Sequence, residues 1–225
     1  MLEVRTGRGK NTLDCLPQEG PDPVNNAPES ALHAVVLAAG KASRFGSPKQ
    51  LAHYAGRPLL QAAVTTAVAV AGSAVSVVLG AHAAEIAPLL RNTPVSVLVN
   101  RAWEEGIGSS LRTAARQLPG ACDGLLVLLG DQPALTPEDL GRLVSAWRAN
   151  PTAIVAASYS GITGVPAIFP RWSFEELGAL RGDTGARQVM HRHRDRVQRI
   201  PLPRAALDID TPEDLVRPDP GSAEG

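Results

Sequence analysis

The chain has 225 residues, a length that suits one α/β domain, and its 44% hydrophobic residues can form a proper core. Its formal net charge is zero, whereas proteins that bind nucleic acid or a membrane surface usually carry a basic excess, so the charge argues against both partners. Aromatic residues make up only 4%, which also argues against stacking platforms for single-stranded nucleic acid.

The first thirty residues are rich in Pro, Asn, Gly and charge, and they lack the apolar stretch of a signal peptide. We expect a flexible leader over 1–30, or a start codon placed too early, and a disordered tail over 218–225. The folded domain is then 31–217. The two cysteines, Cys15 and Cys122, have no metal-site spacing, and no run of about eighteen apolar residues occurs. These features predict a cytoplasmic protein with reduced thiols.

Apolar runs alternate with segments of helical spacing along this domain. The expected strands are His33–Ala38, Ala74–Leu79, Val95–Val99, Gly124–Leu129 and Thr152–Ala157, and the expected helices are Leu59–Val70, Ala84–Leu90, Ser109–Leu118 and Pro137–Ala149. Strands that are apolar on both faces and separated by helices predict a mostly parallel sheet with helices on both faces. The fold class is therefore α/β, a Rossmann-like doubly wound sandwich, which binds ligands at the carboxyl ends of its strands.

The last third is less regular. The segment Gly164–Pro170 suits a strand or one arm of a hairpin, Ser173–Leu180 and Thr184–His193 have helical spacing, and Arg196–Leu202 suits a last strand. The pentapeptide TPEDL occurs twice, at Thr136–Leu140 and Thr211–Leu215. Thr as N-cap, Pro at the first helical position and acids in the first turn predict two helix starts rather than a repeated domain.

The loop after the first strand reads LAAGKASRFGSPKQL, from Leu37 to Leu51. Gly40 allows a sharp turn whose backbone amides can point at an anion, and Arg44 and Lys49 can add fixed positive charge towards phosphate oxygens. The spacing matches neither the P-loop nor G-x-G-x-x-G. An ordinary surface loop with solvated basic residues is the alternative interpretation.

Two further loops carry carboxylates. Asp131 follows the strand Gly124–Leu129, where it could hold Mg²⁺, although a turn aspartate bonded to its own backbone is the plainer interpretation. Asp208 and Asp210 alternate around Ile209 and should point to opposite sides, so we expect only one of them, Asp210, to face the site. Asp131 and Asp210 together could hold one metal ion on a triphosphate.

Two polar clusters remain, NRAWEEGIGSSLR at 100–112 and RGDTGARQV at 181–189. Capping of the following helices, by Ser109 or Ser110 in the first cluster and by Asp183 or Thr184 in the second, is the plain interpretation, and an anion site is the functional one for the second. No G-x-S-x-G elbow supports a Ser-His-Asp triad, and Cys122 lacks the basic neighbours of a nucleophile.

Together these loops resemble the MobA-like nucleotidyltransferases. LAAGKASRFGSPKQL is similar to the family's signature loop L-A-[AG]-G-x-S-x-R-[MF]-G-x-x-K, with Ala42-Ser43 before Arg44 and Phe45 in place of the usual Met. GDQP at 130–133 resembles its metal-binding Asp motif. The clusters at 100–112, 164–170, 181–187 and 208–215 resemble motifs of the molybdenum cofactor cytidylyltransferase branch.

The resemblance implies transfer of CMP from CTP to the terminal phosphate of molybdopterin, with release of pyrophosphate. It implies nucleotide binding by Leu37, Ala38, Ala39, Gly40, Arg44, Lys49 and Gly130, catalysis by Arg44, Lys49 and Asp131, Mg²⁺ binding by Asp131 and Asp210, and acceptor binding by Asn100, Trp103, Ser109, Ser110, Asp183 and Arg187. LAAG tends to accompany CTP and LAGG to accompany GTP, so Ala39 favours cytidine.

Three alternatives stay open. The same fold could serve another nucleotide or another phosphorylated acceptor, such as a sugar or polyol phosphate. MobA-like domains have also been recruited as nicotinamide-dependent reductases of heterocyclic pigments. A third possibility is a carrier that holds molybdenum cofactor for a partner enzyme, and a molybdenum hydroxylase is the partner that the resemblance suggests.

Overall fold

The computed structural model describes residues 31–216, so the leader expected over 1–30 and the tail expected over 218–225 lie outside the described residues. Its main sheet has seven strands in the order β5-β4-β1-β6-β8-β7-β9. Their bounds are β1 Leu32–Ala38, β4 Val75–Leu79, β5 Ser96–Val99, β6 Gly124–Leu129, β7 Ile154–Tyr159, β8 Ile162–Pro170 and β9 Val197–Pro201. A two-stranded ribbon, β2 (His53–Tyr54) with β3 (Arg57–Pro58), lies apart from the main sheet.

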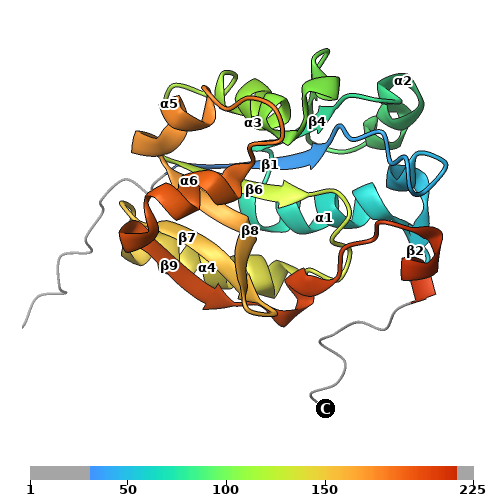
Figure 1. Cartoon of the computed structure of the whole chain (residues 1–225). Helices are drawn as coiled ribbons and strands as arrows, with labels where there is room; N and C mark the ends of the chain where they lie inside the picture. The colour runs from blue at the N-terminus through green and yellow to red at the C-terminus, as the bar shows by residue number, and fades with distance from the viewer. Residues whose placement is uncertain (1–30, 217–225) are drawn as a thin grey trace, which may run out of the picture.

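Helices cover both faces of this sheet (Figure 1). Helices α1 (Leu59–Ala71), α2 (Ala83–Ile86) and α4 (Pro137–Ala149) pack on one face, and α3 (Ile107–Ala115), α5 (Phe174–Leu177) and α6 (Ala186–Arg192) pack on the other. Along β1, Ala34 and Val36 belong to the first core and Val35 and Leu37 to the second. This alternation of fully apolar residues is what places β1 at the centre of a doubly covered sheet.

The predicted fold class is confirmed, with one refinement. Strands β5, β4, β1 and β6 are parallel, whereas β8 pairs antiparallel with both β6 and β7. The chain reverses between β7 and β8 at Ser160 and Gly161, whose φ angles are 46° and 74°. Two consecutive positive φ angles suit a tight hairpin turn, so the segment Gly164–Pro170 is the second arm of a hairpin.

The predicted helix Pro137–Ala149 matches α4 at both ends. Its start is fixed by a complete capping box of Thr136 and Asp139. The expected helix Ala84–Leu90 is shorter and continues as a 3₁₀ turn over Ala87–Leu90. Strand β5 was expected to be covered on both sides, but it is the edge strand, and Val97 and Val99 are exposed. None of the helices within 31–216 is long and apolar enough to cross a membrane.

The order in which the chain adds strands to the sheet reverses at β1. From β1 the chain adds β4 and then β5 on one side, and it returns to place β6 on the other side. The carboxyl ends of β1 and β6 lie together, since Leu37 pairs with Leu129. In open α/β sheets, ligands bind outside the strand ends at such a switch point.

Candidate active site

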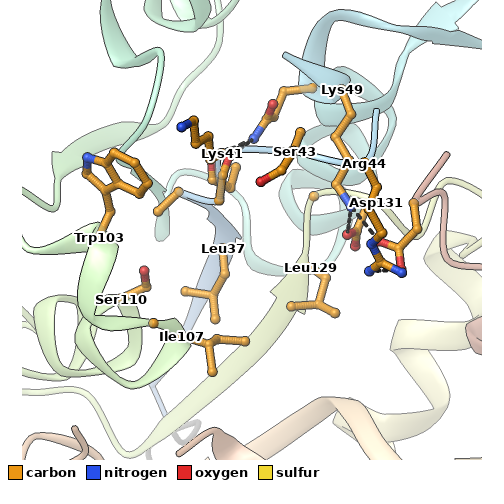
Figure 2. A pocket seen from close by; sticks show the side chains of 18 of the residues that line it. Leu37, Lys41, Ser43, Arg44, Lys49, Trp103, Ile107, Ser110, Leu129 and Asp131 are labelled. Carbon is orange, nitrogen blue, oxygen red and sulfur yellow. Dashed lines mark hydrogen bonds and ion pairs between the residues drawn. The ribbon is translucent and has the colours of Figure 1, made fainter. Parts of the chain in front are cut away.

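A pocket of about 570 Å³ opens at this switch point. Its wall contains the ends of β1 and β6, the loop after β1 and the start of α3, and a volume of this size suits a nucleotide-sized ligand. Figure 2 shows Trp103 at one end and Arg44, Lys49 and Asp131 at the other. Many of the residues expected from the sequence line it: Leu37, Ala38, Ala39, Gly40, Arg44, Lys49, Trp103, Ser110, Gly130, Asp131, Asp183 and Asp210.

The start of the loop after β1 is fixed by hydrogen bonds from Gln50, a residue that the sequence analysis did not single out. Its amide nitrogen donates to the carbonyl oxygens of Ala38 (3.0 Å) and Gly40 (3.2 Å), and the residue is buried. The turn expected at Gly40 is instead made by Ala42 and Gly46, whose φ angles are 56° and 78°. A Cβ atom at Gly40 would meet nothing within 4 Å, so this glycine leaves the strand end open to a ligand.

The charged end of the pocket is built around Lys49. Its Nζ donates to Asp131 Oδ2 at 2.6 Å, to Asp210 Oδ1 at 2.9 Å and to the carbonyl of Ile209 at 2.9 Å. Arg44 donates to Asp210 Oδ2 at 2.8 Å (Figure 2 shows Arg44, Lys49 and Asp131). Two cations and two carboxylates from three distant segments therefore form one network.

Electrostatics within this network favour the charged forms of Lys49 and Asp210. Burial alone would lower the pKa of Lys49, but the carboxylates of Asp131 and Asp210 outweigh it and raise that pKa above its usual value. The hydrogen bond from Lys49 lowers the pKa of Asp210. The side chains of Lys49 and Asp131 are only 15% and 20% exposed, so water screens their attraction weakly.

Asp210 is held in place by its own helix start. Asp214 Oδ2 accepts hydrogen bonds from the backbone nitrogens of Asp210 (2.9 Å) and Thr211 (2.8 Å), and from the Thr211 hydroxyl (3.1 Å). The backbone nitrogen of Ile209 donates to the carbonyl of Asp131 at 3.0 Å, which joins this segment to the end of β6. The second TPEDL thus begins a helix as expected, a 3₁₀ helix over Pro212–Val216, and Asp214 accepts hydrogen bonds at its start.

The opposite end of the pocket is formed by the clusters at 100–112 and 181–189, which pack against each other. The backbone nitrogen of Gly108 donates to the carbonyl of Gly182 at 3.0 Å. A Cβ atom at Gly106, whose φ is 108°, would lie 2.3 Å from an oxygen of Asp183. Only glycine allows this approach, which brings Asp183 beside Trp103 and Ser110 in the pocket wall.

The expected caps in both clusters are wrong. Helix α3 begins at Ile107 with Gly106 as its N-cap, so Ser109 lies inside the helix, and α6 begins at Ala186 with Gly185 as its N-cap. Asn100, expected to bind the acceptor with Ser109, is buried and donates to the Ser109 hydroxyl at 2.7 Å. Neither residue lines the pocket, and both support the wall behind it.

Arg187 lies in a second cavity of about 190 Å³ between β6, α3 and α6. Tyr159 and Asp208 also line it, and neither was expected in a site. Burial first, and then the nearby charge of Asp131, raise the pKa of Asp208 to about 6. Asp208 and Asp210 therefore face different cavities, as their alternation predicts. None of the motifs singled out in the sequence contains Tyr159, which lies at the end of β7.

The pocket offers two carboxylates that could hold a divalent cation, Asp131 and Asp210. Asp131 Oδ1 is buried and has no hydrogen-bond partner among residues 31–216, so it could bind a cation. Within 31–216, no group of three or more His, Cys, Asp or Glu residues could hold a metal ion. A cation here would take its remaining ligands from substrate phosphates and water, as Mg²⁺ prefers.

Comparison with known proteins gives a consistent family. The model of the MobA-like NTP transferase domain matches residues 34–197. Nicotine blue oxidoreductase of Paenarthrobacter nicotinovorans is 32% identical over 195 residues, which cover 81% of this chain and 94% of that protein. The crystal structure of Rv0371c from Mycobacterium tuberculosis H37Rv is 31% identical, with a TM-score of 0.74 over 84% of this chain and 96% of that one. A structure of Rv0371c in complex with manganese is 30% identical, with a TM-score of 0.70 over 82% and 96% of the two chains.

Proposed function

The chain belongs to the MobA-like NTP transferase family, and from this premise we propose that it transfers CMP from CTP to the terminal phosphate of molybdopterin. The observation that carries the proposal is the network of Lys49, Arg44, Asp131 and Asp210 at the carboxyl ends of β1 and β6. Fixed cations beside two carboxylates suit a reaction in which negative charge builds on departing pyrophosphate.

The two ends of the pocket bind different parts of the nucleotide. The triphosphate lies at Arg44 and Lys49, so the base reaches the end that contains Trp103 and Ser110 (Figure 2). This assigns Trp103 and Ser110 to the nucleotide rather than to the acceptor. The methyl group of Ala39 lies in the same wall, and it narrows the space for the base, which supports a pyrimidine over a purine.

In the reaction, an oxygen of the acceptor phosphate attacks the α-phosphorus of CTP. The new P–O bond forms as the bond between the α-phosphorus and the bridging oxygen breaks, and pyrophosphate leaves with that electron pair. Lys49 and Arg44 bind and orient the triphosphate, and they neutralise the charge that develops on pyrophosphate. Asp131 and Asp210 would hold Mg²⁺, which neutralises phosphate charge when bound. The manganese complex of Rv0371c supports the use of a divalent cation by this chain.

A pyrophosphate-release assay tests the proposal. Full-length protein, Mg²⁺ and molybdopterin are mixed with CTP, GTP, ATP or UTP in separate reactions. We expect release with CTP alone. Release with another nucleotide would retain the transferase mechanism and refute the choice of cytidine. Silence with all four, in a folded sample, would refute the proposed reaction.

A second candidate is a nicotinamide-dependent reductase, because nicotine blue oxidoreductase is 32% identical over most of both chains. Hydride transfer requires neither a metal nor a lysine that binds pyrophosphate, so the Lys49 network favours the transferase. The reductase predicts NADPH consumption with a quinonoid dye, and it predicts that Lys49→Met leaves this rate within about twofold. The carrier alternative predicts tight pterin binding without pyrophosphate release.

A further inference from the structure

The second cavity adjoins the main pocket, because Leu37, Ile107 and Leu129 line both. Most of its wall is apolar, and this part of the wall consists of Leu37, Ile107, Leu111, Val127, Leu129, Val165, Ala186 and Met190. Its volume of about 190 Å³ is roughly six times the ~30 Å³ that a water molecule occupies in the liquid. It has room for one fused ring system and none for a second nucleotide.

The polar groups of this cavity are Tyr159, Arg187 and Asp208. The Tyr159 hydroxyl donates to the carbonyl of Val165 at 3.2 Å. Asp208 Oδ1 is buried and has no hydrogen-bond partner among the described residues, and the same is true of Oε1 of the neighbouring Gln132. The cavity wall therefore contains one buried acceptor atom, Asp208 Oδ1, that lacks a donor among the described residues.

A buried acceptor without a donor costs about 1–3 kcal/mol, and more where the group is charged. Within 31–216, Asp208 caps no helix and forms no salt bridge, and the side-chain hydrogen bond with Gln132 leaves its Oδ1 without a partner. Asp208 also belongs to no group of three or more His, Cys, Asp or Glu residues that could hold a metal, within the part of the chain that the structure describes. A ligand that supplies an N–H donor would remove this cost.

We propose that the second cavity binds the planar ring system of the acceptor, and that Asp208 accepts a hydrogen bond from an N–H group at the edge of that ring. Arg187, on the opposite element α6, provides the complementary donor for a ring oxygen or nitrogen. This inference rests on the proposed nucleotidyl transfer for the location of the acceptor, which must approach the α-phosphorus from outside the base and triphosphate ends of the main pocket.

The apolar wall distinguishes this class of acceptor from the sugar and polyol phosphates that the sequence left open. A sugar would place several hydroxyls against Leu111, Val127 and Met190, where they would lose water without gaining partners. A heteroaromatic ring can instead pack its faces against these side chains and direct its polar edge to Asp208 and Arg187.

The test measures binding directly, with the full chain and without nucleotide. The probes are 6-hydroxymethylpterin and its 2-dimethylamino analogue, which lacks the N–H donors of the amino group, and binding is followed by pterin fluorescence. Wild type is compared with Asp208→Ala, which removes the acceptor oxygens, and with Asp195→Ala, a control whose side chain is 96% exposed outside the cavity. We expect wild type and Asp195→Ala to bind the pterin at least tenfold more tightly than the analogue. Asp208→Ala should lose this preference.

Equal affinity of wild type for both probes, or an unchanged preference in Asp208→Ala, would overturn the inference. The pyrophosphate assay separates this failure from failure of the proposed function. Wild-type release from CTP with molybdopterin, together with no preference between the probes, refutes the ring subsite and retains the reaction. A preference that depends on Asp208, without any pyrophosphate release, retains the subsite and refutes the reaction. Asp208→Ala should also raise the KM for the acceptor at least tenfold and leave the KM for CTP within about twofold.

Discussion

Replacement of Lys49 by Met tests the network at the centre of the site. The substitution keeps most of the side-chain volume and removes three hydrogen bonds, those to Asp131, Asp210 and the carbonyl of Ile209. Two carboxylates then lie close together without the cation that joins them. We expect the variant to fold and to be less stable than wild type at neutral pH.

The magnitude follows from burial. Breaking a fully buried ion pair costs about 3–5 kcal/mol, whereas exposed pairs contribute at most about 1 kcal/mol. The side chains of Lys49, Asp131 and Asp210 are 15%, 20% and 39% exposed, so the pair lies between these limits, and we expect about 2–3 kcal/mol. For a domain of this size, each kcal/mol lowers Tm by about 2–4 °C, which predicts a decrease of roughly 4–12 °C.

The effect should depend on pH in a defined direction. Lys49 lowers the pKa of Asp210 from its ordinary 3.8, so the stability gained is present above that value and is lost as the pH falls through the folded pKa. The raised pKa of Lys49 means that its contribution is full below 10.5 and is lost only as the pH rises above the folded value. The difference between wild type and variant should therefore be largest between about pH 4 and pH 10.

Circular dichroism melts of wild type, Lys49→Met and Lys41→Met, from pH 3.5 to pH 9, measure this difference. Lys41 lines the same pocket but is exposed, so its substitution controls for loss of a positive charge from the loop. A Lys49→Met variant as stable as wild type at pH 7, or a difference that does not shrink at pH 3.5, would refute the role given to this network.

Three further substitutions test other parts of the structure. Asp131→Asn should lower the rate of pyrophosphate release about 10²–10³-fold while the far-ultraviolet circular dichroism spectrum is unchanged, and a rate within threefold of wild type would contradict its role. Gly124→Ala should cost about 1–3 kcal/mol in urea unfolding, because its Cβ would lie 2.4 Å from Trp147, whereas the control Gly141→Ala, which meets nothing within 4 Å in α4, should stabilise by up to about 1 kcal/mol. Asp208→Asn should raise Tm by a few degrees above pH 6 and have little effect below pH 4. The raised pKa of Asp208 means that the folded state favours the neutral carboxyl, so wild type loses stability as the pH rises through about 6, and the variant does not. Equal effects on Tm at both pH values would contradict this.

Local signals account for the elements that the sequence predicted well. Helix α4 has its own capping box at Thr136 and a Pro at its first position, so its start is fixed by residues adjacent in the chain. The start of α3 depends instead on Gly106, which lies against Gly182 from a segment more than seventy residues away. Such a contact has no signature in the surrounding sequence, and the serines at 109 and 110 resembled a cap that the fold does not use.

The candidate site also has a part that the sequence could predict and a part that it could not. Because parallel strands end at one edge of a sheet, the sequence could assign the loops of Lys49 and Asp131 to a common site. It could not show that Lys49 bonds directly to both Asp131 and Asp210, the second of which is 161 residues away. That contact requires the segment after β9 to return to the end of β6, where the backbone nitrogen of Ile209 bonds to Asp131.

The alternation of Asp208 and Asp210 leads to a different conclusion once both cavities are known. Period-two geometry sends the two carboxylates to opposite sides of the segment, and from the sequence alone only Asp210 is expected to face the site. In the structure the side of Asp208 opens into the second cavity, where Asp208 Oδ1 lacks a donor among the described residues. Under the two proposals, one short segment would contribute to both substrates, with Asp210 at the triphosphate and Asp208 at the acceptor ring. Asp214 accepts hydrogen bonds from the backbone of this segment and so fixes its position. Substitution of Asp214 should therefore weaken binding of both substrates, whereas substitution of Asp208 or Asp210 alone should weaken binding of one.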